Sequence, residues 1–465
     1  MRIGLQTSHA NAIALGEAAA GGGGLDLPLE DWDGGPDYWT VAENGTKMTK
    51  AEANGWSDPS FFPIAVWLSD PAHADDLFAI GVNTYLGIFA NVGAINTAAA
   101  AGMHIIPQAN EWTPAEVNAE TTGRDSVVGW LPIDEPELNS PFATYMSSVS
   151  TIEALADGRF ILTNFCHGIR RTVFYAGETQ GGTSTEMLDA VAVNDASCVD
   201  QYCYTSPGIR GNLGPQGVAD NANFPSLHGG TSYLWPGAFQ DYAKVEQASA
   251  YGWQAQALSS LYTEQGLHRP VWVAVETQMP YLTDTGRDII LYAEIRGAVW
   301  SAIVNGAKGI LYFQHNGFYS ANELGPGNPA ASYTANGGND PNTGAAPDQD
   351  TMSLVDGPAG LISAVDTLNT QITSLAPVLN TQSYVWDFSA SGIETMLKVY
   401  NDDVYIFATK SVLGTTGSKT FTLPSGISGT VVTVVDEART INVSGGQFDD
   451  TFANEYTAHI YRIPL

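Results

Sequence analysis

The stretch FFPIAVWLSDPAHADDLFAIGVNTYLGIF, residues 61–89, decides the fold. Two continuous apolar runs, 61–68 and 82–89, flank a segment, 70–81, with the pattern of a helix. Apolar runs that do not alternate strictly with polar residues are typical of strands buried on both faces of a parallel sheet. The stretch therefore predicts a strand, a helix and a second, parallel strand.

Six further apolar runs continue this pattern along the chain: MHIIPQ (103–108), VVGWLPI (127–133), RFILTNF (159–165), CVDQYCY (198–204), VWVAVE (271–276) and GILYF (309–313). Helix-like segments lie between several of them, for example at 286–307. Eight β-then-α units in about 320 residues predict an α/β fold, a (β/α)8 TIM barrel. A doubly wound sheet is the alternative, but no G-x-G-x-x-G follows the first run.

The chain changes character on both sides of the predicted barrel. Apolar residues at 361, 365, 368, 372 and 375 predict an amphipathic helix that ends at Pro377. Short strands separated by turn residues then predict an antiparallel β-sandwich over 380–465. We expect a Gly-rich N-terminal arm over 1–58, the barrel over 59–379, and a sandwich that braces the barrel rather than binding carbohydrate.

The charge of the chain excludes some partners. Its 465 residues contain 18 Lys and Arg against 49 Asp and Glu, a net charge of −31. Such a surface repels phosphate, so nucleic acid is not expected as a partner, and an anionic membrane is disfavoured for the same reason. No window of 18 apolar residues predicts a membrane-spanning helix. The first residues make a poor secretory signal, because their apolar stretch is broken by polar residues.

Carboxylates stand at the ends of two predicted strands. The fourth run ends in Asp134 and Glu135, and the seventh ends in Glu276. Because side chains at the C-terminal strand ends of a barrel converge, the two glutamates are expected to face each other across its mouth. Glycoside hydrolysis needs such a pair, one protonated and one ionised. The alternative for either residue is a helix cap or an ion pair.

These motifs resemble the large clan of retaining (β/α)8 glycoside hydrolases, in which a Glu follows strand four and a second Glu ends strand seven. The resemblance implies that Glu135 is the general acid/base and Glu276 the nucleophile. FFPIAVWLSDP, GVNTYLGIF, GWLPIDEPE and E-x-R-x-x-x-W-S-A-I-x-N-G-A-K-G-I-L-Y-F look more closely like a group of glycosidase-like barrel proteins with a β-sandwich tail. The similarity covers roughly 60–465.

The chain departs from the clan at position 134, where Asp stands in place of the usual Asn. A carboxylate beside Glu135 would raise the pKa of its neighbour and help it to stay protonated. Asp134 is therefore a further catalytic candidate, either through this effect or in proton transfer itself.

Polar and aromatic groups near the strand ends are the candidates for binding a sugar, because sugar CH faces stack on rings and hydroxyls need fixed polar partners. They are Trp67, Asn110, Trp112, Trp130, Tyr202, Tyr204, Gln278, Gln314 and His315. Core packing is the alternative for the tyrosines, Trp67 and Trp130. Asp200, Tyr202 and Tyr204 alternate along the sixth run, so they are expected on one strand face, where a tyrosine would donate to Glu276.

No cofactor and no catalytic metal are expected, since neither H-x-H nor H-E-x-x-H occurs. The leading hypothesis is a retaining O-glycosidase that cleaves a cell-surface or extracellular polysaccharide. The alternative is a carbohydrate-binding or structural phage tail protein with a weakly active or inactive barrel. Either would act outside the cell, in a virion tail or after secretion. Residues 1–55 are then expected to be held by a second copy or by another tail protein.

Overall fold

A computed structural model describes residues 24–31, 34–166, 169, 174, 183–205, 246–277, 290–314, 353–357, 359–412 and 414–465. Their largest sheet is parallel, with strand order β3-β2-β1-β8-β7-β6-β5-β4. The strands are β1 (Ile64–Ser69), β2 (Thr84–Ile88), β3 (His104–Ile106), β4 (Gly129–Trp130), β5 (Phe160–Phe165), β6 (Ala196–Val199), β7 (Val271–Glu276) and β8 (Gly309–Phe313). Isolated parallel bridges, Ile105–Val127 and Gln108–Leu131, join the outermost strands β3 and β4. The predicted (β/α)8 barrel is confirmed.

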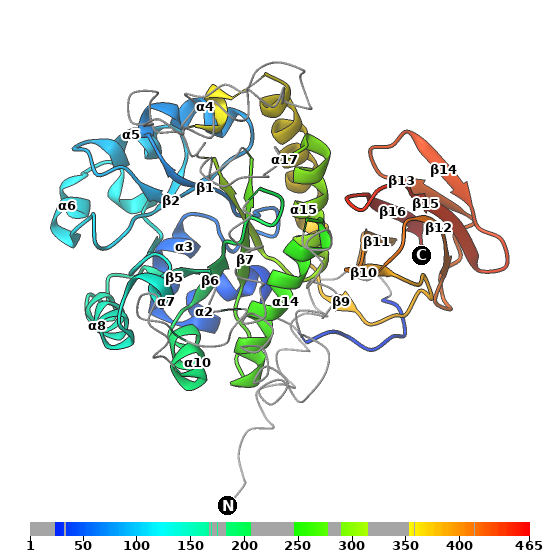
Figure 1. Cartoon of the computed structure of the whole chain (residues 1–465), viewed down its shortest axis with the longest axis horizontal. Coiled ribbons are helices and arrows are strands. Elements are labelled where there is room, and N and C mark those ends of the chain that lie inside the picture. The colour runs from blue at the N-terminus through cyan, green and yellow to red at the C-terminus, as the bar shows by residue number, and fades with distance from the viewer. Residues whose placement is uncertain are drawn as a thin grey trace, which may run out of the picture.

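Helices alternate with these strands (Figure 1). They are η3 (Pro71–His73), α4 (Ala74–Ala79), α5 (Ala94–Ala100), α6 (Pro114–Ala119), η4 (Arg124–Ser126), α7 (Pro136–Asn139), α8 (Phe142–Glu153), α10 (Ser184–Ala192), α14 (Ser249–Glu264), α15 (Tyr292–Val304), η8 (Leu354–Asp356) and α17 (Ala359–Leu379). The prediction that the last helix ends at Pro377 was wrong, because α17 continues to Leu379. Proline is tolerated there since it lies in the last turn, where it removes a single backbone hydrogen bond.

The strands separate two layers of core. In β7, the side chains of Val271, Val273 and Val275 belong to the cluster between strands and helices. The intervening Trp272 and Ala274 belong to the cluster inside the barrel. Both faces of the strand are therefore buried, which explains why its sequence is a continuous apolar run.

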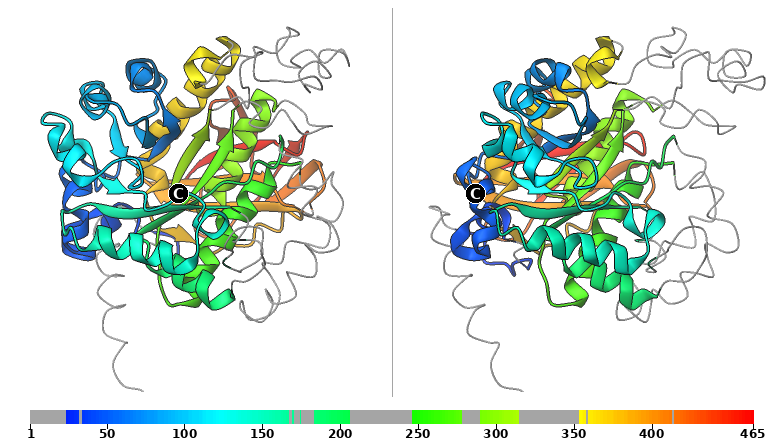
Figure 2. Two further views of the ribbon diagram at one scale, coloured as in Figure 1. Left: turned by 60° about the vertical axis from the view of Figure 1, so that its left-hand side comes forward. Right: turned by 90° about the vertical axis from the view of Figure 1, so that its left-hand side faces the viewer.

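The segment of residues 34–56 covers one end of the barrel. It forms η1 (Gly35–Trp39), α2 (Val41–Asn44), η2 (Thr46–Met48) and α3 (Thr49–Ala53), drawn in dark blue in Figure 2. Trp39 packs on Phe160 with ring centroids 4.9 Å apart, and Trp56 stacks on Trp272 at 6.1 Å. Since Phe160 and Trp272 lie at the beginnings of their strands, this segment closes the N-terminal end of the barrel. Residues 34–56 are thus held by their own barrel.

The C-terminal region forms a six-stranded antiparallel sheet, in the order β14-β13-β16-β11-β10-β9, and a separate β12-β15 pair. Its strands are β9 (Ser383–Tyr384), β10 (Ile393–Tyr400), β11 (Asp403–Lys410), β12 (Gly417–Thr422), β13 (Val431–Val434), β14 (Arg439–Asn442), β15 (Gln447–Phe452) and β16 (Ala458–Pro464). The predicted antiparallel sandwich is confirmed.

The sandwich packs directly on the barrel, beside α15 (Figure 1). Trp300 of α15 stacks on Phe407 of β11, with ring centroids 5.7 Å apart. A Cβ on Gly297 of α15 would lie 2.6 Å from Tyr456, so the approach requires glycine. This contact agrees with a bracing role for the sandwich. In the described part of the chain, no helix is long and apolar enough to cross a membrane.

Candidate active site

Glu135 stands at a strained backbone position between β4 and α7. Its φ of 43° and ψ of 55° lie in the left-handed region, and Pro136 follows as the first residue of the helix. Its amide N donates to the carbonyl of Asn164, at the end of β5, over 3.0 Å. A left-handed conformation costs a residue with a side chain on the order of 1 kcal/mol, and such strain clusters at functional sites. The turn presents both Asp134 and Glu135 at the barrel mouth.

Asn164 joins two acids from different strand ends. Its Nδ2 donates to Asp134 Oδ1 over 3.0 Å and to Asp200 Oδ2 over 2.8 Å. A carboxylate oxygen of Asp200 lies within 4.8 Å of one of Glu135. Asp134, Glu135 and Asp200 therefore form one group, which we call the acid cluster.

The acid cluster favours bound protons. Burial, with the charge of Glu135, raises the pKa of Asp134 to about 7. Burial and the charges of Glu135 and Asp134 raise the pKa of Asp200 well above its ordinary value. Burial also raises the pKa of Glu135, against the opposing effect of its hydrogen bonds. A carboxyl group that keeps its proton near neutral pH is what a general acid requires.

Glu276 lies in a different environment at the end of β7. It is fully buried, and its Oε1 accepts from the amides of Tyr204 and Thr205, each over 3.1 Å, and from the Thr205 hydroxyl over 3.2 Å. The Tyr251 hydroxyl donates to Oε2 over 2.5 Å. Burial raises the pKa of Glu276 to about 7, although these donors favour the carboxylate and lower it.

The segment 200–205 contributes residues both to the acid cluster and to the surroundings of Glu276. Asp200 belongs to the acid cluster, whereas Tyr204 and Thr205 donate to Glu276. The expectation that Asp200, Tyr202 and Tyr204 share one strand face was wrong, because β6 already ends at Val199. The chain turns after the strand and separates the two tyrosines, which pack into different clusters of the core.

Neither tyrosine donates its hydroxyl to Glu276. The Tyr202 hydroxyl donates to Asp200 over 3.3 Å, and the Tyr204 hydroxyl donates to Glu455 of the sandwich over 2.6 Å. The phenol that reaches Glu276 belongs to Tyr251 of α14. Nothing in the sequence marks Tyr251, because it lies in a helix and not at a strand end.

The three tryptophans proposed to bind sugar are buried. The indole nitrogen of Trp112 donates to the carbonyl of Ile88 over 3.1 Å, and that of Trp130 donates to Asp157 over 3.3 Å. Trp67 packs inside the barrel. These surroundings favour the packing role that the sequence left open for Trp67 and Trp130.

The remaining candidates lie in several places. Asn110 is exposed in the turn after β3. Gln314 is buried and links β1 to η8, since its Nε2 donates to the carbonyl of Trp67 over 3.1 Å and its Oε1 accepts from the Leu354 amide over 3.2 Å. Gln278 and His315 lie outside the described residues.

Sequence reasoning missed Asn164 and Thr205 as well as Tyr251. The sequence did mark Asn164, because it is a polar amide next to the end of the predicted strand 159–165. It did not mark Thr205, since Thr205 acts mainly through its backbone amide.

One group of described side chains has the spacing of a metal site. Ligand atoms of Glu135, Cys166 and Asp200 all lie within 4.8 Å of one another. A thiolate with two carboxylates suits a borderline cation such as Zn²⁺. Occupation would take Glu135 away from proton transfer, so the acid role and the metal role exclude each other.

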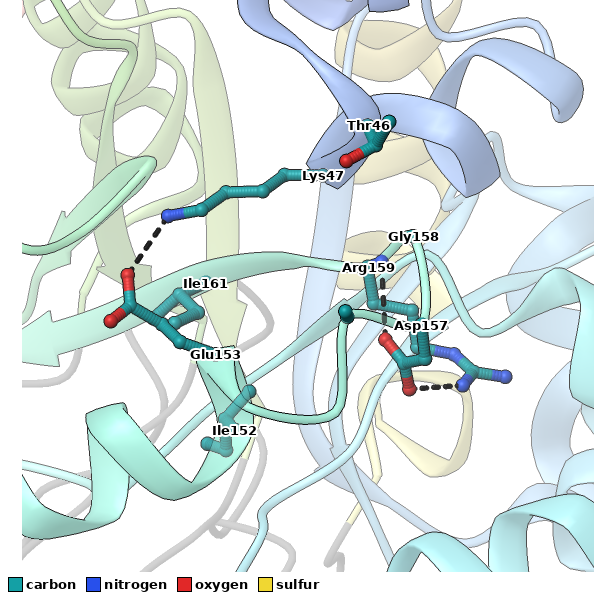
Figure 3. Close-up of a pocket in the computed structure, with 9 residues that line it drawn as sticks. Thr46, Lys47, Ile152, Glu153, Asp157, Gly158, Arg159 and Ile161 are labelled. Carbon is teal, nitrogen blue, oxygen red and sulfur yellow. Dashed lines mark hydrogen bonds and ion pairs between the residues drawn. The ribbon is translucent and has the colours of Figure 1, made fainter.

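A pocket at the opposite end of the barrel does not suit a substrate. It lies beside the beginning of β5, between the first helices and the end of α8, and its charged side chains already pair with each other (Figure 3). Lys47 Nζ lies 3.0 Å from Glu153 Oε1, and Arg159 contacts Asp157 over 2.5 Å. The acid cluster follows the C-terminal ends of the strands, where barrel enzymes perform their chemistry.

No family model matches the sequence, and no curated protein does. Among solved structures, the chain is similar to an α-amylase from Geobacillus thermoleovorans in complex with acarbose, with 11% identity, 87% of this chain and 98% of that chain covered, and a TM-score of 0.44. It is similar to a family 5 glycoside hydrolase from Bacteroides vulgatus, with 11% identity, 87% of this chain and 89% of that chain covered, and a TM-score of 0.46. It is also similar to the trehalose-6-phosphate hydrolase of Bacillus licheniformis, with 10% identity, 87% of this chain and 100% of that chain covered, and a TM-score of 0.39. Function therefore has to be argued from the site itself.

Proposed function

We propose that the protein is a retaining glycoside hydrolase acting on a cell-surface or extracellular polysaccharide. One observation carries the proposal: strand ends β4 and β7 hold two glutamates in unlike environments. Glu135 lies beside Asp134 and Asp200, whose pKa values are raised, whereas Glu276 accepts four hydrogen bonds that lower its pKa against the larger effect of burial. Unlike environments for two carboxyl groups are the arrangement that assigns an acid and a nucleophile.

In this mechanism Glu135 donates its proton to the glycosidic oxygen while Glu276 attacks the anomeric carbon. The bond to the leaving group breaks and a covalent glycosyl-enzyme forms. Glu135, now ionised, takes a proton from water, which attacks the same carbon and releases Glu276. Burial favours the protonated form of Glu135 between cycles, although its hydrogen bond with Asp200 lowers the pKa and opposes this effect. The net charge of −31 favours a neutral or cationic glycan over an anionic one.

Glu135→Gln and Glu276→Gln test the proposal. Each should lower kcat on aryl glycosides or cell-wall polysaccharides by at least about 10³-fold, since proton transfer alone contributes about 10²–10⁴. Glu116→Gln is the matched control, because Glu116 caps α6 and glutamine also serves in a capping box. Wild-type turnover in both site variants, with folding intact, would contradict the proposal.

The stereochemistry of the product tests the mechanism separately. NMR of the first-formed product should show the same anomeric configuration as the substrate. An inverted configuration would indicate a single displacement instead of the proposed double displacement. Glycan binding without turnover would favour the alternative function, a carbohydrate-binding tail protein.

A further inference from the structure

We propose that Glu455, a residue of the sandwich, positions the catalytic Glu276 of the barrel. The inference rests on the proposed function for the role of Glu276. Glu455 lies between β15 and β16 and is half-buried at the contact between the two domains. It touches neither the acid cluster nor Glu276, so its effect has to pass through other groups.

The two carboxylate oxygens of Glu455 bind two separate segments of the barrel. Oε1 accepts from the hydroxyl of Tyr204 over 2.6 Å, and Oε2 accepts from the amide of Ala248 over 2.8 Å. Ala248 is the N-cap of α14, where the helix dipole favours a negative charge. A buried tyrosine hydroxyl also costs free energy when it lacks an acceptor. Both contacts therefore stabilise the observed placement of their segments.

Each of these segments supplies a donor to Glu276. The amide of Tyr204 donates to Oε1, and Tyr251, one turn into α14 from Ala248, donates to Oε2. The rings of Tyr204 and Tyr251 stack with centroids 5.7 Å apart and an interplanar angle of 23°. One carboxylate of the sandwich thus fixes the donors to both oxygens of Glu276.

Tyr204→Phe separates this role from direct contact, because it removes the hydroxyl that binds Glu455 and keeps the amide that binds Glu276. Glu455→Gln weakens the same contacts from the other side, since its amide nitrogen cannot accept a hydrogen bond. Looser donors stabilise the carboxylate less, so Tyr204→Phe should raise the pKa of Glu276 by about half a unit or more. The double variant should behave like Glu455→Gln alone, because the hydroxyl that Tyr204→Phe removes acts only through Glu455.

The titration can be followed by ¹³C NMR of protein labelled at the glutamate carboxyl carbon, with the signal identified by its loss in Glu276→Gln. On an aryl glycoside, kcat should fall about tenfold in Tyr204→Phe and in Glu455→Gln, while KM changes less than about twofold, as expected when transition-state stabilisation is lost.

Arg296→Met is the matched control. Arg296 donates to the carbonyl of Ala458 across the same interface over 2.9 Å but does not contact Glu276 or its donors. It should lower the melting temperature and leave the titration and kcat unchanged. An unchanged Glu276 pKa in Tyr204→Phe, or an equal shift in Arg296→Met, would overturn the positioning role. Absence of turnover in the wild type would contradict only the proposed function, because the NMR titration does not require activity.

Discussion

At Glu276, burial and hydrogen bonding act on one carboxyl group in opposite directions. Burial dominates and raises the pKa to about 7, while the hydroxyl of Tyr251 and the groups of Thr205 lower it. A nucleophile must be ionised, so activity should be lost as the pH falls through this value. We expect kcat/KM to rise between about pH 6 and pH 8, with the acid limb set by Glu276.

Tyr251→Phe removes one donor to the ionised form of Glu276. Because that hydrogen bond lowers the pKa, its loss should raise the pKa, and the acid limb of kcat/KM should move to higher pH by about 0.5–1 unit. A pH–rate profile on an aryl glycoside checks this. Tyr262→Phe is the control, since Tyr262 lies in the same helix and pairs with Ser197. A limb that stays in place in Tyr251→Phe would contradict the assignment of the acid limb to Glu276.

Asp200 should make the folded protein less stable as the pH rises. Its folded pKa lies well above the unfolded value, so its contribution is present at low pH and is lost as the pH increases through the folded pKa. Asp200→Asn cannot titrate and should therefore gain stability relative to the wild type as the pH rises above the unfolded pKa of an aspartate, about 4. Denaturant unfolding at several pH values measures this gap. A difference in unfolding free energy between the variant and the wild type that does not change with pH would contradict the raised pKa of Asp200.

At the scale of elements, the neighbouring strands β7 and β8 pack closely because a large side chain on one lies against a glycine on the other. Trp272 of β7 is paired in register with Gly309 of β8, and a Cβ on Gly309 would lie 2.6 Å from the indole. Gly309→Ala should therefore destabilise the barrel by about 1–3 kcal/mol. Chemical denaturation measures the loss. In a chain that already carries Trp272→Leu, Gly309→Ala should cost less stability than it does in the wild type. If the stability losses of the two substitutions simply add in the double variant, this packing is contradicted.

The barrel strands could be predicted because burial on both faces leaves a continuous apolar run, as in 271–276. The sandwich was harder. Its strand β15 has the sequence QFDDTF, in which two acids break the apolar pattern of a strand. Asp450 is nevertheless buried, and it contacts Arg439 over 2.7 and 3.0 Å. An acid that is buried by its ion pair with a neighbouring strand has no signature in the local apolar pattern.

The candidate site was predictable only as far as strand ends reveal it. Asp134, Glu135 and Glu276 follow from their strands. Tyr251 and Glu455 do not, because one lies in a helix and the other in a different domain. Their roles arise from tertiary contacts that no local pattern encodes.

At the scale of the whole molecule, the core between the strands and helices of the barrel extends into the sandwich, which also has a core of its own. Buried residues of α15 and α17 belong to the same cluster as Met396, Phe407, Ala458 and Ile460 of the sandwich. Calorimetry of the full chain should therefore show one unfolding transition, with the calorimetric enthalpy equal to the van't Hoff enthalpy. Two resolved transitions would mean that the domains unfold independently. A chain that stops at residue 379 should aggregate, since it exposes this apolar face.

The segment that closes the base of the barrel has a consequence for biosynthesis. Tyr38 hydrogen-bonds to Asp195 and Arg269, partners 157 and 231 residues away, and Trp56 stacks on Trp272. On the ribosome these aromatic side chains emerge long before the strands that receive them. Until then they are exposed and open to chaperones, because contacts of large sequence separation form slowly. The part of the fold that is synthesised early is thus among the last to reach its native place.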